Sequence, residues 1–529
     1  MSKSAISISY FGITAYESSS SVARPLQREG VPVLLLLLHF RLRFYWLVGF
    51  AGLWASVSTV IGAEGQPVRL EDAIRLALAN NPQIKVDAFD QSIARAELLI
   101  ARGRFDPALT FRRDYEEDGT PFSANPLVAS LIKTDRASIA FEGVTPWGLN
   151  YSIGGSALNQ RYPLSGYTDN FATFGGVSVT QPLLRGFGFR ANLQGVRVAK
   201  ADRGIADWQF RQSVIDTVTD VIIAYSDLAY AQQFLRIAQR SRSLAAGLLS
   251  ENEKRFQVGS MSENDVAQAR ARTATRDEAI LYAEQGVRNA VNRLRQLMGE
   301  MAFAVAPAEI VVEPAEVPTG MTVEPAADLS RALHDRPDYQ AAKLGIYKRE
   351  VAHSAARNQL LPQVDFVGSY GYSGLDRDFG VSRRMIQDQD NRSYSAGVVV
   401  SVPLTFADGR GRARSARLRL RQAEADLTRL EQEIAIRIAR AAGEIETTRR
   451  RVEANRAAYD LAKQALDAEL KKLRAGTSNT FFVLNLQGEL AGVENSLYRA
   501  LADQRQAHAT YDREIGRTLA VHQVELARQ

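Results

Sequence analysis

The sequence predicts a mainly helical fold joined to a membrane β-barrel: a long coiled-coil α-barrel continues into an antiparallel β-barrel that the chains of an oligomer share. Three features of the 529-residue chain lead to this fold class. Two very long helical stretches end at glycines in similar sequence contexts, Gly259 and Gly476. Between helices, the hydrophobic period changes to the two-residue alternation of strands. The same motifs recur at fixed distances, which indicates an internal two-fold duplication.

The N-terminal region, residues 1–63, has the pattern of a targeting segment. Basic Arg41 and Arg43 precede an apolar run over 44–63 that ends in small residues, as in a signal peptide. A run of about 20 apolar residues can also anchor a chain in a bilayer. Small and polar residues in its second half favour the signal peptide. Because 63 residues are long for a signal, translation is expected to start downstream of Met1.

The remaining chain is predicted to consist of two structural repeats, 64–299 and 328–529, separated by a proline-rich joint at 300–327. The tip glycines are 217 residues apart, and so are two later glycines, Gly299 and Gly516. A second set of matches has an offset of 255 residues, including Ala77-Leu78 with Ala332-Leu333 and Pro82 with Pro337. We therefore expect each repeat to contain one helix, a strand region and one long helical hairpin.

Gly259 and Gly476 are predicted to be the turns of these hairpins. Each follows more than 60 residues of helix-forming sequence and precedes a serine or threonine, the pattern of a helix stop followed by the cap of a new helix. The outbound helices, 191–258 and 410–475, would each be about 100 Å long. Both return helices are shorter than the outbound ones. Helices over 70–104 and 328–361 are therefore expected to lie end to end with them and to make up the length of the outbound helices. Both chain ends and the proline-rich joint would then lie at one level, as an equatorial belt.

Strands are predicted over 108–182 and 363–403. Phe366 and Tyr370 alternate with polar or small residues in the second region, as do Val177 and Val179 in the first. Such alternation fits strands with one face toward lipid and the other toward water. A half-buried sheet of a globular domain is the alternative, but the rest of the chain forms helices too long to cover one. Because one chain supplies too few strands to close a barrel, we expect a closed ring of chains.

The two strand regions differ in length. Pro107 and Pro182 are 75 residues apart, whereas Pro362 and Pro403 are 41 apart. The additional segment contains a turn-like sequence at 141–148, either in a large extracellular loop hairpin or between extra barrel strands. The number of strands therefore stays open at this point.

Composition argues against several other classes of function. The chain has no cysteine, and its five histidines lack the spacing of metal ligands. Basic and acidic residues are mixed along the helices, which does not favour nucleic-acid binding. No nucleophile, base and orienting group can be assembled from the motifs, so we expect neither an enzyme nor a cofactor.

Together, the glycine tips, the helix starts and two strand-ending phrases, Gln181-Pro182-Leu183 and Val402-Pro403-Leu404, resemble the TolC family of outer-membrane efflux proteins over about 70–519. The resemblance implies a homotrimer with a 12-stranded barrel among the lipids of a Gram-negative outer membrane and a helical tunnel across the periplasm. It further implies the exit duct of a tripartite efflux or type I secretion system, with a periplasmic adaptor and an inner-membrane transporter as partners.

The resemblance also assigns roles to residues at the tips. The motif by which adaptors meet the family's tips maps onto Val258-Gly259-Ser260 and Ala475-Gly476-Thr477. In well-known members, an acidic ring near the second tip surrounds the closed entrance, and an arginine links that tip to an aspartate beyond the first tip. Asp265 matches this aspartate, whereas Ser478, Phe482 and Asn485 occupy the positions of the arginine and the acidic ring.

A different closing device is therefore expected, with an apolar or amide constriction in which Phe481 or Phe482 acts as a dewetting gate. The alternative to the whole interpretation is a periplasmic coiled-coil scaffold without a pore. Such a scaffold would share the helices but would have no use for the alternating strands. The cargo and the partner pump are not indicated by the sequence.

Overall fold

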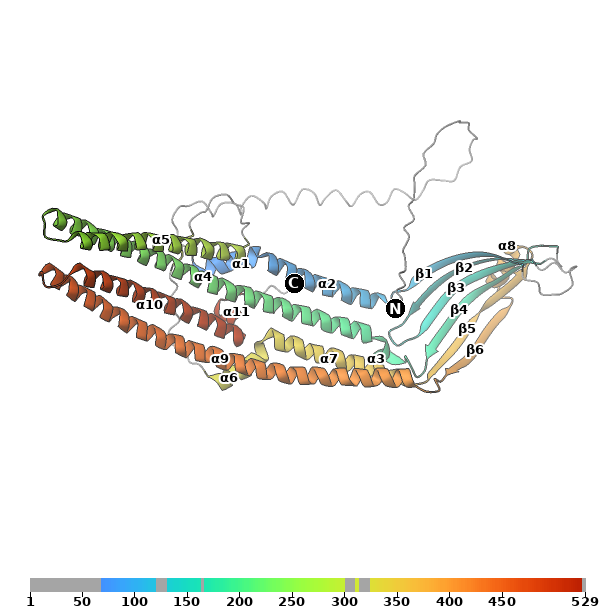
Figure 1. Cartoon of the computed structure of the whole chain (residues 1–529). Helices are drawn as coiled ribbons and strands as arrows, with labels where there is room; N and C mark the ends of the chain where they lie inside the picture. The colour runs from blue at the N-terminus through green and yellow to red at the C-terminus, as the bar shows by residue number, and fades with distance from the viewer. Residues whose placement is uncertain (1–67, 120–130, 163–165, 300–309, 314–323, 526–529) are drawn as a thin grey trace, which may run out of the picture. The chain divides into compact units, whose positions relative to one another are not determined.

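The computed structural model describes residues 68–119, 131–162, 166–299, 310–313 and 324–525, all within one unit of the chain, Pro67–Gln529. Long helices run side by side toward two tips, and a twisted sheet lies at the opposite end (Figure 1). The predicted signal region, 1–63, and most of the proline-rich joint, 300–309 and 314–323, lie outside the described residues.

In the first half of the chain, two helices precede four strands and three helices follow them. A break at Asn81 divides the helix predicted over 70–104 into two helices, and Leu193 separates a short helix from the long outbound one. The predicted outbound helix 191–258 thus begins three residues later. The helices are α1 Leu70–Asn80, α2 Pro82–Gly103, α3 Gly188–Asn192, α4 Gln194–Gln257 and α5 Glu263–Leu297.

The second half follows the same order with two strands. The helix predicted over 328–361 is interrupted at Arg336, whose backbone is extended because Pro337 disfavours the helical conformation of the residue before it. The helices are α6 Pro325–Asp335, α7 Pro337–Asn358, α8 Phe379–Gln387, α9 Ala407–Arg474, α10 Thr480–Glu514 and α11 Thr518–Val521.

Six antiparallel strands form one sheet in the order β1-β2-β3-β4-β5-β6. The excess length of the first strand region is therefore two additional strands. A trimer with 12 strands would require four strands per chain, whereas the sheet of this chain has six. The strands are β1 Ala108–Asp118, β2 Ile132–Val144, β3 Asn150–Arg161, β4 Phe171–Pro182, β5 Gln363–Asp376 and β6 Arg392–Ser401.

The register gives the sheet two chemically different faces. Leu109, Phe141, Ile153, Val177 and Tyr370 are consecutive partners across the strands and therefore share one face. These side chains are 38–71% exposed although all are large and apolar or aromatic. The intervening positions on the opposite face are mainly polar or small, such as Thr110, Glu142, Ser152, Ser178 and Ser369.

The helices next to the sheet follow the same order as the strands that they join. Helix α4 contacts both α2 and α7, and α7 contacts α9. Helix α2 leads into β1, β4 leads through α3 into α4, α7 leads into β5, and β6 leads into α9. Four helices therefore each continue one strand, whereas β2 and β3 connect only to neighbouring strands.

Each half of the chain has one joint midway along its long helices. There the break between two shorter helices, at Asn81 or at Arg336, packs against the C-terminal end of a return helix. In the first joint, the Asn81 side chain donates a hydrogen bond to the carbonyl oxygen of Leu297, the last residue of α5 (2.8 Å). In the second joint, Arg336 donates to the carbonyl oxygen and the carboxylate of Glu514, the last residue of α10 (both 2.7 Å).

The described pieces of both chain ends and of the proline-rich segment meet near the first joint. Val68 forms a parallel bridge with Val312. The Tyr225 hydroxyl of α4 lies 2.9 Å from the Val68 carbonyl oxygen and 3.0 Å from that of Glu313. Leu519, near the C-terminus, belongs to the same buried hydrophobic cluster as Val312. These contacts bring the described pieces together in one chain, and the equatorial belt stays a prediction.

No helix among the described residues is both long enough and apolar enough to cross a membrane.

Candidate functional site: the helical tips

At the first tip, helix α4 ends in a Schellman motif. The Gly259 N–H donates to the Phe256 carbonyl oxygen and the Ser260 N–H donates to that of Arg255, both at 2.9 Å. Gly259 has φ = +74°, which the absence of a Cβ makes accessible. The Ser260 hydroxyl also donates to the Arg255 carbonyl oxygen (3.0 Å). The serine after the glycine thus strengthens the helix end, and the following helix is capped by another residue.

The second tip repeats this geometry. The Gly476 N–H donates to the Leu473 carbonyl oxygen (3.1 Å), and the Thr477 N–H donates to that of Lys472 (3.0 Å). Gly476 has φ = +78°, and the Thr477 hydroxyl donates to the Lys472 carbonyl oxygen at 3.2 Å. The predicted hairpin turns are therefore confirmed as turns at both glycines.

Both glycine turns are open to solvent. The six residues predicted to dock an adaptor are exposed, and the Val258 side chain reaches 78% exposure. A Cβ added at Gly259 or Gly476 would meet no atom within 4 Å. Glycine is therefore required here by backbone conformation alone, and the tips present small side chains and backbone to any partner.

Each return helix begins with its own side-chain cap. In the first hairpin, the Ser262 hydroxyl oxygen accepts from the Asp265 N–H (3.2 Å) and the hydroxyl donates to the Asp265 carboxylate (2.6 Å). In the second, the Asn479 side-chain oxygen accepts from the Phe482 N–H (3.2 Å). The hydrogen bonds that the structure gives to Asp265 are therefore those of a helix cap within its own tip.

Of the residues predicted to close the entrance, Asp265 lies on the first tip and the other four lie on the second. The Ser478 hydroxyl donates a hydrogen bond to Glu469, which also pairs with Lys472 (3.2 Å). The hydrogen bond from Ser478, followed by that from Lys472, holds the pKa of the Glu469 carboxyl below its ordinary value. This polar link connects the tip loop of the second hairpin to α9. Among the described residues, no hydrogen bond or ion pair joins Ser478 to Asp265 of the first tip.

Phe481, Phe482 and Asn485 lie on the exposed side of the first two turns of α10. The two phenylalanine rings are in edge contact, with centroids 5.8 Å apart, and are 48% and 54% exposed. One turn beyond Asn485, Glu489 is also exposed. The sequence interpretation missed this carboxylate, which the four-residue spacing from Asn485 would have indicated.

Beneath the tips, the two hairpins pack against each other through a small hydrophobic cluster. Leu248 of α4 lies with side chains of both helices of the second hairpin, including Leu466 and Val483. Next to it, the Thr480 hydroxyl donates to the side-chain oxygen of Asn252 (3.3 Å), and both residues are buried. In the described residues the Nδ2 of Asn252 has no hydrogen-bond partner. The Asn252 amide at this contact therefore forms a hydrogen bond through its oxygen but not through its nitrogen.

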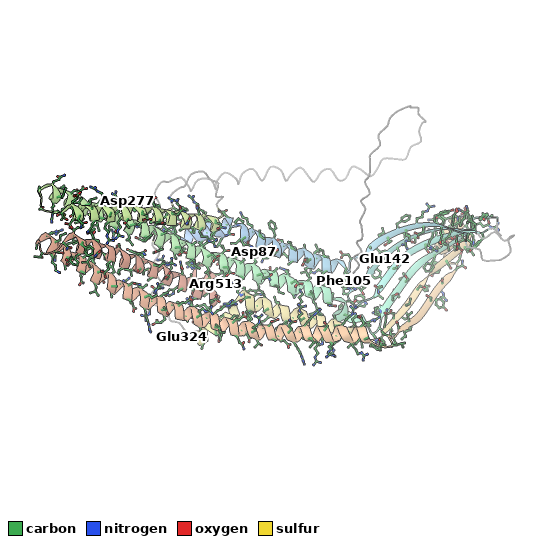
Figure 2. All side chains as sticks on the ribbon, in the orientation of Figure 1. Asp87, Phe105, Glu142, Asp277, Glu324 and Arg513 are labelled. Carbon is green, nitrogen blue, oxygen red and sulfur yellow. The ribbon has the colours of Figure 1, made fainter. Side chains whose placement is uncertain are left out.

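Further from the tips, polar contacts join α4 to α10. We call them the hairpin seam: Arg240 pairs with Glu494 (3.0 Å), Tyr230 donates to Asn495 (2.9 Å), and Arg499 pairs with Asp227 (3.1 Å). Separate ion pairs hold the first hairpin together, such as Arg242–Asp277 (2.8 Å). Figure 2 shows Asp277 on α5 toward the tips and Glu142 in the sheet at the other end. The seam is thus a row of polar contacts between the outbound helix of the first hairpin and the return helix of the second.

Among the described residues, no group of His, Asp and Glu side chains is arranged to hold a metal ion.

Comparison with known proteins agrees with this geometry. The family model described as "Outer membrane efflux protein" matches residues 73–300 and 329–517. The chain is 26% identical to the outer membrane efflux protein BepC of Brucella suis biovar 1 (strain 1330) over 330 residues, which is 62% of this chain and 68% of BepC. It is 22% identical to the proteases secretion protein PrtF of Dickeya chrysanthemi over 359 residues, 67% of each chain. Its fold is similar to that of the outer-membrane channel OprN (TM-score 0.66, 17% identity, 84% of this chain and 89% of that one).

Proposed function

This chain belongs to the outer membrane efflux protein family, and from that premise we propose that it is the homotrimeric exit duct of a tripartite efflux or type I secretion system. Its localisation is the outer membrane, with a long periplasmic helical portion. The proposed partners are a periplasmic adaptor at the tips and an inner-membrane transporter beyond it. The family consists of channel proteins rather than enzymes.

The observation that carries the proposal is the position of two unlike surfaces at opposite ends of the same helices. One end is a sheet with an exposed apolar face and a polar face. The other consists of two exposed glycine turns about 100 Å away, given α4 and α9 of 64 and 68 residues. A membrane segment at one end and a docking surface at the other suit a duct between two membranes.

A ring of chains is supported by the edges of the sheet. Within the described residues, β1 and β6 are the two edges, and all their residues are exposed. Unpaired backbone groups at such edges are not tolerated in the hydrocarbon region of a membrane. Pairing β1 of one copy with β6 of the next would remove every edge.

The first experiment is the native mass of the protein extracted in detergent from an outer-membrane fraction. A mass of three mature chains, with conductance after reconstitution, is expected of the proposed duct. A soluble monomer or an open series of oligomers would instead support the pore-free coiled-coil scaffold.

Adaptor docking at Val258-Gly259-Ser260 and Ala475-Gly476-Thr477 is tested by crosslinking. Because the chain has no cysteine, Ser260→Cys and Thr477→Cys each introduce a single thiol. We expect a bifunctional reagent to link both variants to a periplasmic protein in intact cells. Thr428→Cys, on the exposed surface of α9 far from the tips, is the matched control. Equal crosslinking of all three positions would remove the support for docking at the tips.

We propose that the closed entrance is narrowed by Phe481 and Phe482, supported by Asn485, and that opening separates the hairpins at the seam. The exposed rings and the lack of a described polar link between Asp265 and Ser478 support an apolar gate. Phe482→Ala is expected to raise single-channel conductance in planar bilayers severalfold. Tyr282→Ala removes a more exposed ring from α5 (70% against 54% for Phe482) and should leave conductance unchanged. An unchanged conductance in Phe482→Ala would refute the apolar gate.

A further inference from the structure

The connection between β6 and α9 lies where the chain passes from the sheet to the long helices (Figure 1). Strand β6 continues the apolar face, because Tyr394 is the partner of Tyr370, and Val398 and Val400 follow at two-residue spacing. Leu404, four positions beyond Val400, keeps this alternation after the strand has ended and is 98% exposed. The apolar face of the sheet thus extends into the connection.

A groove of about 600 Å³ opens beside Leu404. Two neighbouring connections line it: Leu360 lies between α7 and β5, and Leu404, Thr405, Phe406 and Arg410 follow β6. Three of these side chains are large and apolar, and one is a cation. The groove therefore combines the two kinds of surface that an anionic amphiphile requires.

The backbone of this connection holds Arg410 beside the apolar side chains. Phe406 has φ = +50° and ψ = +18°, a left-handed conformation that residues with a Cβ rarely adopt. Its carbonyl oxygen accepts from the Arg410 N–H (2.9 Å), and the Arg410 guanidinium donates to the Thr405 carbonyl oxygen (2.6 Å). A guanidinium has five N–H donors, so this bond leaves others for a ligand. Strained backbone of this kind is concentrated at functional sites.

Arg410 begins a stripe of arginines along α9. Arg414, Arg417 and Arg421 follow it at spacings of four, three and four residues, which places all four on one face of the helix. All are exposed, and among the described residues none of them forms an ion pair with a carboxylate. Residues 407–423 contain six arginines and a single acidic residue. The stripe is therefore available to an anion.

The stripe begins at the depth of lipid headgroups. The apolar face ends at Leu404, and the headgroup layer beyond the hydrocarbon is about 5–7 Å thick. Arg410 and Arg414 are about 6 Å apart along the helix axis, so both fall within this layer. Arg417 and Arg421 follow within about 10 Å of it, which is about one Debye length. Basic residues this close to a membrane attract anionic lipids.

The corresponding junction in the first half of the chain has the same composition. Between β4 and α4, four large apolar side chains are 43–55% exposed, and basic residues follow at Arg197 and Lys200. These positions lie 217 residues before Arg414 and Arg417, which is also the distance between the tip glycines. A merely solvated helix start would have no need of exposed leucine and phenylalanine in both halves. The apolar side chains are Leu183, Leu184, Phe187 and Phe189.

We propose that the groove between β6 and α9 binds an anionic phospholipid of the periplasmic leaflet, with its phosphate on Arg410 and an acyl chain along Leu404 and Phe406. Guanidinium groups bind phosphate oxygens through paired N–H donors, and the rest of the stripe attracts the negative charge. Such a lipid holds the sheet at a fixed depth in the outer membrane. The proposal rests on the outer-membrane position of the chain and on neither the trimer nor the gate, so its failure would leave the exit duct standing.

The direct test is native mass spectrometry of the detergent-solubilised protein, titrated with dioleoyl phosphatidylglycerol or dioleoyl phosphatidylcholine. Because each arginine near a lipid surface contributes about fivefold in affinity, we expect phosphatidylglycerol to bind more tightly by about tenfold or more. Equal binding of the two lipids would overturn the proposal and leave the groove to side chains of a neighbouring copy.

Two double variants remove equal charge at the same depth from opposite faces of α9. Arg410→Gln/Arg417→Gln removes half of the stripe. Arg412→Gln/Arg419→Gln removes two arginines that line a separate groove with Arg349. The first variant should bind phosphatidylglycerol about 25-fold more weakly, whereas the second should keep the wild-type affinity. An equal loss in both variants would show a general attraction of lipid to a basic helix and would overturn the assignment to the groove.

Leu404→Asn tests whether the ligand is a lipid rather than a soluble phosphate. Because Leu404 is almost fully exposed, the substitution should not disturb folding. It should lower the affinity for phosphatidylglycerol about tenfold, because the contact with the acyl chain is lost. Free glycerol 3-phosphate, which carries a phosphate without chains, should not compete with the lipid.

Competition by glycerol 3-phosphate, together with unchanged lipid binding in Leu404→Asn, would assign the groove to a soluble anion and overturn the proposal. If the arginine variants fail to fold, the lipid comparison on the wild-type protein and the Leu404→Asn variant still decide the outcome.

Discussion

The two joints midway along the helices perform the same structural task with different chemistry. In the first, the neutral Asn81 amide bonds the last carbonyl group of α5. In the second, the Arg336 guanidinium bonds both the last carbonyl group of α10 and the carboxylate of the same residue, Glu514. Asn81 and Arg336 are 6% and 5% exposed, so both groups are buried. A common backbone arrangement thus tolerates either a neutral contact or a buried ion pair.

The difference teaches that position, rather than side-chain identity, decides which atoms meet at such a break. Residues 81 and 336 both precede a proline that starts a helix. At each joint the side chain points at a helix C-terminus, whose final carbonyl groups lack intrahelical partners. An amide satisfies one of these groups. An arginine does so with a charge that favours the negative end of the helix dipole but requires a counterion when buried.

The largest expected effect comes from removing the two side chains. Arg336→Ala removes the ion-pair partner of Asp338 and leaves the buried Glu514 carboxylate with only its contact to Arg513 (3.1 Å), which should lower the free energy of unfolding by about 3 kcal/mol. Asn81→Ala removes one neutral hydrogen bond and one helix cap and should lower it by about 1–2 kcal/mol. Thermal unfolding followed by circular dichroism of the detergent-solubilised protein compares them. If Asn81→Ala lowered the free energy of unfolding as much as Arg336→Ala, the predicted difference between the neutral and the charged joint would be wrong.

The second expected effect concerns the glycine beside each joint. Gly299 and Gly516 have nearly equal φ values, +73° and +74°, so replacement by alanine imposes the same backbone strain. At Gly299, however, the new Cβ would lie 2.4 Å from the Asn80 carbonyl oxygen, against 3.3 Å from the nearest Asp335 atoms at Gly516. Gly299→Ala should therefore be about 1–3 kcal/mol more destabilising than Gly516→Ala.

Gly259→Ala is the matched control for this pair. Its φ is also +74°, and a Cβ there meets nothing within 4 Å, so it reports backbone strain alone, about 1 kcal/mol. The same thermal measurement applies to all three variants. An equal loss of stability in Gly299→Ala and Gly259→Ala would show that the contact between residue 299 and the Asn80 carbonyl oxygen does not contribute to the free energy of unfolding.

The smallest expected effect is a dependence on pH confined to the second joint. Burial alone would raise the pKa of the Asp338 carboxyl, but the hydrogen bond and charge of Arg336 outweigh it and hold this pKa below the ordinary 3.8. The unfolded chain therefore binds the proton more readily than the folded chain. The ionised carboxylate stabilises the second joint above about pH 4, and this stabilisation is lost as pH falls through the folded pKa.

Hydrogen exchange near the two joints measures this difference. Between pH 5 and pH 3, after correction for intrinsic rates, residues 334–340 should lose protection while residues 79–85 keep theirs. In Asp338→Asn this pH-dependent loss should largely disappear, because the titrating group is gone. An equal loss of protection at both joints would show that acid destabilises the whole molecule, and would contradict a specific role of Asp338.

Much of the architecture is determined by the sequence alone because its signals are local. Asn81-Pro82 breaks a helix wherever it occurs, and Gly259 and Gly476 end helices by their own backbone freedom. The alternation around Phe366 and Tyr370 specifies a strand with two unlike faces without reference to any partner. Repeated offsets then predict the order of elements, and family resemblance predicts the duct.

Only the tertiary structure decided the strand count and the polar pairings. Whether the segment around 141–148 folds over the sheet or joins it depends on pairing with β1 and β4, which local alternation does not specify. The contacts Arg336–Glu514 and Asn81–Leu297 join residues 178 and 216 positions apart. Asp265 and Ser478 each form hydrogen bonds within their own tip, with Ser262 and Glu469, and not with each other. Such pairings depend on where whole helices pack, because the energy of burying or satisfying a polar group is determined by all the elements around it.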